Sequence, residues 1–74
     1  MSSETGIFAA VTAAGTQDKL AELLGVTQQA VSTWLSQGWV PLRRAKEIEA
    51  QTGVHRLRLV NPRVLDLVNL DRKV

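Results

Sequence analysis

The pattern of apolar and polar positions divides the first 53 residues into four short helical segments, each followed by a glycine. The predicted helices span residues 7–14, 17–24, 28–37 and 41–52, and the glycines after them are Gly15, Gly25, Gly38 and Gly53. A glycine is typical after a helix, because it adopts the left-handed conformation without a steric penalty from Cβ. Four helices separated in this way predict a compact all-α domain.

Apolar residues at helical spacing predict the core. Thr16 and Thr27 carry the hydroxyl that an N-cap needs, and Pro41, which lacks an N–H, is suited to the first position of the fourth helix. The positions predicted to face inward are Ile7, Phe8 and Val11; Leu20, Leu24, Val26, Val31 and Trp34; and Leu42, Ala45, Ile48 and Thr52.

The tail after Gly53 is open to two interpretations. Residues 54–60, VHRLRLV, alternate partly like a strand, Asn61-Pro62 is a turn signal, and residues 64–68, VLDLV, could return as the second strand of a β-hairpin. The other interpretation is a helix, or an irregular extension with a helical turn. We expect part of the apolar tail to cover the core and the rest to form a dimer surface, from Leu57, Leu59, Val60, Val64, Leu65, Leu67, Val68 and Leu70.

The third predicted helix has two different sides. Val31, Trp34 and Leu35 lie on one side, which places Trp34 in the core. The other side is wholly polar and uncharged, and it consists of Gln28, Gln29, Ser32, Thr33 and Ser36. Such a face suits hydrogen bonding to base edges in a major groove.

The block from Gln17 to Ser36 resembles the helix-turn-helix of the phage Cro and cI repressors. The matching positions are Gln17, Ala21, Gly25, Val26 and Val31, and the resemblance continues through A-V-S-x-W at residues 30–34 and G-W-V-P at residues 38–41. The resemblance covers residues 7–53 and implies a four-to-five-helix lambda-repressor-like fold. We expect a single domain over residues 1–74, in which residues 6–53 form the core and residues 54–74 form a C-terminal extension.

The resemblance also implies which side chains contact DNA. Base contacts are expected from Gln28, Gln29, Ser32 and Thr33, because glutamine can bond adenine twice and a threonine methyl can touch thymine. Gln17 is expected to contact a phosphate and to brace Gln28. For Thr27 both a cap and a DNA contact stay open, as does the role of Trp39. The backbone-contacting candidates are Gln17, Lys19, Thr27, Ser36, Arg43 and Arg44, with Lys46, Arg56, Arg58 and Arg63 as weaker ones.

Composition limits the other classes of function. Residues 1–30 hold one lysine against three carboxylates, a sum of −2, whereas residues 31–74 hold eight basic and four acidic side chains, a sum of +4, which suits a phosphate-facing surface. The chain has no cysteine and a single histidine, His55, so we expect no metal site, and no enzyme signature or cofactor motif is present. With no bilayer-length apolar run and no basic signal segment, we expect a cytoplasmic, nucleoid-associated protein of a bacterial host.

The sequence therefore predicts a phage or prophage Cro-like repressor that binds a pseudo-palindromic operator as a homodimer, with no small-molecule ligand. Two alternatives remain. The chain could be an antitoxin of the helix-turn-helix type whose apolar tail holds a toxin, or a protein-interaction module that contacts no DNA.

Overall fold

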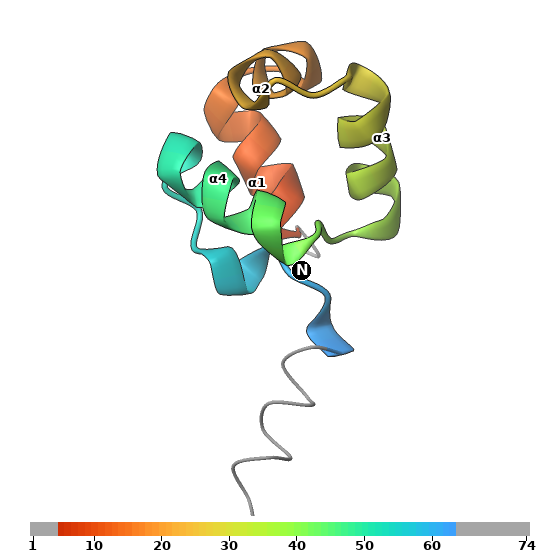
Figure 1. Ribbon diagram of the computed structural model, residues 1–74, viewed down its shortest axis with the longest axis vertical. Helices are drawn as coiled ribbons and strands as arrows, with labels where there is room; N and C mark the ends of the chain where they lie inside the picture. Colours follow the sequence, from red (N-terminus) through yellow and green to blue (C-terminus); the bar gives the residue numbers. More distant parts are fainter. Residues whose placement is uncertain (1–4, 64–74) are drawn as a thin grey trace, which may run out of the picture.

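The computed structural model describes residues 5–63, and within this range every element is helical (Figure 1). The elements are α1 (Gly6–Ala14), α2 (Gln17–Leu24), α3 (Gln28–Gln37), α4 (Leu42–Thr52) and a 3₁₀ turn, η1 (Arg56–Arg58). In Figure 1, α2 lies across the top, α3 stands at the right, α1 and α4 pack side by side, and η1 lies below α4. The predicted all-α fold is confirmed.

Threonine side chains cap the first three helices. The hydroxyls of Thr5, Thr16 and Thr27 accept backbone N–H groups of the next turn at 3.1, 3.0 and 3.1 Å. Each bond satisfies a donor that would otherwise lack a partner at the helix start. The fourth helix begins differently: Pro41 is its N-cap, with an extended ψ of 147°, and Leu42 is the first helical residue. The prediction of Pro41 as the first residue of the helix is therefore wrong by one position.

The core is a single cluster of buried apolar side chains to which all four helices contribute. Its members are Ile7, Ala10, Leu20, Ala21, Val31, Trp34, Val40, Ala45, Ile48, Val54, Leu59 and Val60. Val11, Leu24, Val26 and Leu35 are partly buried against this cluster. The burial of Trp34 agrees with its predicted place in the core.

Two predicted core residues point into solvent instead. Phe8 is 46% exposed and Leu42 is 52% exposed. Ile7 and Ala10 define the inner face of α1, and Phe8, one residue on from Ile7, is rotated by about 100° from it. Val40, two residues before Leu42, is 1% exposed and belongs to the core cluster.

The segment after Gly53 turns back onto the core without forming a strand. His55 is the N-cap of η1, and its Nδ1 accepts the N–H of Leu57 at 3.0 Å. Leu59 is fully buried, and its carbonyl accepts the N–H of Val40 at 2.8 Å. The first strand of the alternative β-hairpin is therefore wrong, because residues 54–60 form a turn that buries Leu59 and Val60. The predicted second strand and the remaining apolar tail positions lie outside the described residues.

The start of α1 and the end of η1 approach each other closely at Gly6. A Cβ atom built on Gly6 would lie 2.1 Å from the carbonyl oxygen of Arg58, which is backbone and cannot rotate away. Glycine is therefore required here because of space. This contact and the bond between Val40 and Leu59 hold η1 against two separate parts of the chain.

We expect Gly6→Ala to destabilise the fold by about 1–3 kcal/mol, the usual cost of forcing extra atoms into a filled site. Helix propensity alone has the opposite sign, because alanine is favoured over glycine in a helix by up to about 1 kcal/mol. Urea unfolding of both proteins measures the difference. A more stable variant would show that Gly6 does not pack against Arg58.

An ion pair connects η1 to α4. The Nε of Arg56 donates to the Oε1 of Glu49 at 2.6 Å. This hydrogen bond is the largest effect on the pKa of Glu49 and lowers it from its ordinary value. Desolvation, the next largest effect, raises the pKa but does not cancel this lowering. Because the folded protein then binds fewer protons than the unfolded chain, the contribution to stability is present above the ordinary glutamate pKa of about 4.3 and is lost as the pH falls below it.

We therefore expect Glu49→Gln to be less stable than the wild type near pH 7, with the difference shrinking as the pH is lowered towards about 3, because protonation of Glu49 removes the charge that pairs with Arg56. Urea midpoints at the two pH values measure this convergence. Arg56→Met should remove the same pH-dependent difference, because Glu49 then lacks its partner. A difference between wild type and Glu49→Gln that stays constant with pH would contradict the assignment.

Candidate nucleic-acid interface

A tight turn joins α2 to α3 and fixes the angle between them. Gly25 adopts the left-handed conformation with φ 71°, and Val26 donates its N–H to the carbonyl of Ala21 at 3.0 Å. Ala21 is 5% exposed, and Leu20 and Val31 are fully buried beside it. A small residue at position 21 lets the two helices pack closely, so these residues hold α3 in one orientation relative to α2.

The outer side of α3 is the candidate contact surface. Five exposed side chains without formal charge lie on it, and we call this surface the α3 polar face: Gln28, Gln29, Ser32, Thr33 and Ser36. The inner side of the same helix buries Val31 and Trp34. The structure therefore brings all four predicted base-contacting residues, and the predicted backbone-contacting residue Ser36, onto one face.

Gln37 extends this face and was missing from the sequence prediction. It lines an open hollow together with Gln29, Ser32, Thr33 and Ser36. Because residues four apart on a helix lie on the same face, the position of Gln37 four residues after Thr33 would have allowed its inclusion in the prediction. Its Nε2 donates to the carbonyl of Trp39 at 2.9 Å, so its amide is already held by the loop that leads to α4.

Gln17 lies next to the α3 polar face, but its partner differs from the expected one. Its Oε1 accepts a hydrogen bond from the Oγ of Ser32 at 3.0 Å. The resemblance to repressors implied a brace to Gln28, whereas the hydrogen bond that Gln17 makes across to α3 in the described residues goes to Ser32. Ser32 is one helical turn further along α3 than Gln28, so the bond ties the second turn of α3 to the first residue of α2.

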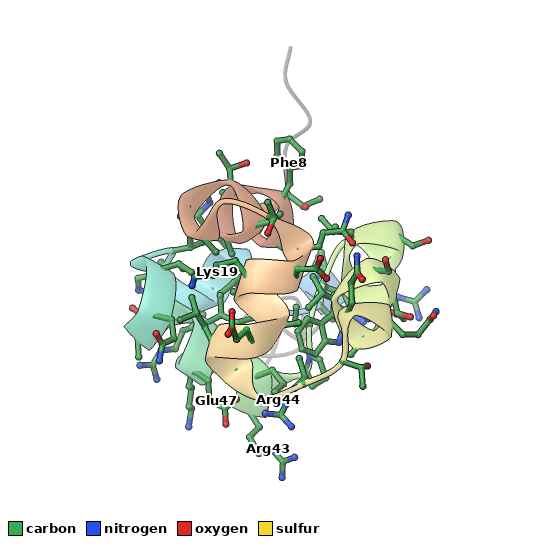
Figure 2. The ribbon with its side chains drawn as sticks, turned by 90° about the horizontal axis from the view of Figure 1, so that it is seen from above. Phe8, Lys19, Arg43, Arg44 and Glu47 are labelled. Carbon is green, nitrogen blue, oxygen red and sulfur yellow. The ribbon has the colours of Figure 1, made fainter. Side chains whose placement is uncertain are left out.

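The predicted phosphate-contacting cations are divided between two elements. Lys19 on α2 lies 3.7 Å from Glu22, and Arg44 on α4 lies 2.8 Å from Glu47. The Lys19 pair is exposed and the Arg44 pair is partly exposed, and ion pairs at the surface contribute little to stability, so a phosphate can compete for either cation. Figure 2 shows Arg43 and Arg44 projecting from the same end of α4, with Phe8 at the opposite edge of the view. Arg43 is exposed and makes no ion pair with a residue in the described range 5–63.

Thr27 caps α3, because its hydroxyl oxygen accepts the N–H of Ala30. This bond uses an oxygen lone pair, and the hydroxyl proton is still able to donate to an outside acceptor.

Across residues 5–63, no three His, Cys, Asp or Glu side chains are grouped as a metal site would need. No helix in this part of the chain is long and apolar enough to cross a membrane.

Two helices joined by a glycine turn, with a buried small residue at their crossing and a polar outer face on the second helix, define a small helix-turn-helix domain. The chain belongs to the family described as Bacterial toxin YdaS, whose pattern matches residues 7–59. This match runs from the first turn of α1 to the buried Leu59 and includes the whole helix-turn-helix. No curated protein and no solved structure matched the chain significantly.

Proposed function

We propose that this protein is a sequence-specific, double-stranded DNA-binding transcription regulator. The observation that carries the proposal is the α3 polar face, which is exposed on the second helix of a helix-turn-helix and carries no charged side chain. An uncharged face rich in amides and hydroxyls can approach base edges without the cost of desolvating an ion. In the proposed complex α3 enters the major groove, and Gln28, Gln29 and Thr33 read the bases.

Phosphates would be contacted from both sides of α3. Gln17 and Lys19 lie in the first turn of α2, whereas Arg43 and Arg44 lie in the first turn of α4, which follows the loop after α3. Thr27 and Ser36 can add hydroxyl contacts along α3 itself. Contacts to phosphates would place the helix in register on the duplex, while contacts to bases carry the sequence preference.

The finer proposal is a Cro-like repressor of a phage or prophage that acts in the bacterial cytoplasm. A homodimer would place two copies of α3 in successive major grooves, about one helical turn apart, on a pseudo-palindromic operator. Repression would follow from occupation of an overlapping promoter. The resemblance of residues 7–53 to Cro and cI repressors supports this version. The proposal includes no catalytic step, cofactor or small-molecule ligand.

Gln28→Ala should weaken binding to the preferred operator by about 1–3 kcal/mol and leave binding to unrelated DNA nearly unchanged, because the amide reads a base. The operator is first identified by selection from random duplexes with the wild-type protein. Gln51→Ala is the matched control, because Gln51 is an exposed glutamine on α4. Equal losses on operator and unrelated DNA would remove Gln28 from the base-reading set.

Arg43→Ala should weaken binding to operator and unrelated DNA by the same factor, and it should reduce the slope of log affinity against log salt by about one. Arg58→Ala is the comparison variant: Arg58, one of the weaker candidates, is exposed on η1, which lies below α4 and away from α3 (Figure 1), so its loss should change the slope less than the loss of Arg43. Titrations at several salt concentrations measure both slopes. An unchanged slope for Arg43→Ala would show that Arg43 does not face a phosphate.

A second candidate function comes from the description of the family, which names a bacterial toxin. In this version the chain is one member of a toxin–antitoxin pair and acts through a protein partner. The two candidates differ in what the α3 polar face must do. If expression of the chain arrests bacterial growth, and a variant with both Gln28→Ala and Gln29→Ala arrests it equally, the effect does not depend on DNA readout and the second candidate is favoured.

A further inference from the structure

A hydrogen bond from Ser32 to Gln17 connects the α3 polar face to the first residue of α2. Within residues 5–63 it is the one side-chain-to-side-chain hydrogen bond that joins α2 to α3. Gln17 is the first residue of α2 and is partly buried, whereas Ser32 is exposed on the second turn of α3. The bond therefore lies at the border between the α3 polar face and the start of α2.

The direction of this bond determines what each group can still do. The Ser32 hydroxyl uses its single proton on the Oε1 of Gln17, so only its lone pairs remain for another partner. The Gln17 amide, held by its oxygen, keeps two N–H donors on Nε2 that Ser32 does not engage. An amide N–H suits a phosphate oxygen, because hydrogen bonds to charged acceptors are the stronger ones.

Building on the proposed function, we propose that Ser32 is a positioning residue and not a base reader. It orients the Gln17 amide so that Nε2 donates to a phosphate oxygen at the edge of the major groove that α3 enters. The pair thus acts as one unit that sets the register of α3 on the duplex. Base discrimination along α3 falls to its other polar side chains, Gln28, Gln29 and Thr33.

A double-mutant cycle tests the unit on two duplexes, the operator selected with wild-type protein and an unrelated sequence. Gln17→Ala should weaken binding to both duplexes roughly tenfold per bound copy, which is the effect of losing a hydrogen bond to a charged group. Ser32→Ala should weaken both by a smaller factor, roughly threefold to tenfold, without changing the preferred bases. In the Gln17→Ala background, Ser32→Ala should have no further effect.

Two conservative variants separate positioning from a purely structural role. Ser32→Thr keeps the hydroxyl donor and should restore binding to within about twofold of wild type, as expected when the hydrogen bond is retained. Gln17→Glu keeps the acceptor for Ser32 but replaces the N–H donors with a negative charge. A carboxylate at the start of a helix favours the fold, so unfolding should be unaffected or slightly harder while DNA binding falls below that of Gln17→Ala.

Other outcomes overturn the proposal. Additive losses from Gln17→Ala and Ser32→Ala, or an altered base preference in Ser32→Ala, would show that Ser32 contacts DNA itself. Wild-type affinity in Gln17→Glu would show that Gln17 donates to no phosphate. In both cases the wild type still binds its operator, so the proposed function survives. A wild-type protein that binds neither duplex would end the proposed function and this inference together.

Discussion

The close packing of α2 against α3 is the constraint on which the rest of the structure depends. It requires a small side chain at Ala21, a left-handed glycine at Gly25 and the bond from Val26 back to Ala21. Leu20 and Val31 fill the space beneath the two helices and are fully buried. Because these contacts fix the inner side of α3, they also fix which of its residues face outward. The candidate site is thus a consequence of core packing.

The helices and their boundaries could be predicted from the sequence because the signals are local. Threonine caps and glycine ends act within one turn of the backbone, and they gave α2 and α3 their observed bounds. The errors arose where distant contacts decide the outcome. Val40 is buried whereas Leu42 is exposed, and the turn at residues 54–60 buries Leu59, whose carbonyl accepts the N–H of Val40. The residue spacing near Val40 and near Leu59 does not indicate that these two residues meet in the folded chain.

The candidate site shows the same division. The outward set on α3 follows from helical periodicity alone, so residues 28, 29, 32, 33 and 36 were predictable as one face. The partner of Gln17 was not predictable, because it depends on how α2 and α3 are rotated relative to each other. A bond to Ser32 instead of Gln28 changes the chemistry available to both groups. The ion pairs of Lys19 and Arg44 also show that a basic residue in the sequence is not automatically an unpaired cation in the structure.

A selection of bound duplexes from a random library tests most directly whether the α3 polar face reads DNA. The purified full chain is used at two salt concentrations, and enriched sequences are compared. If α3 reads bases in a dimer, the enriched sequences form an inverted repeat with half-sites about one helical turn apart, bound less tightly as salt increases. A library from which no sequence is enriched at either salt concentration would show that the α3 polar face does not read DNA and would point to recognition of another protein.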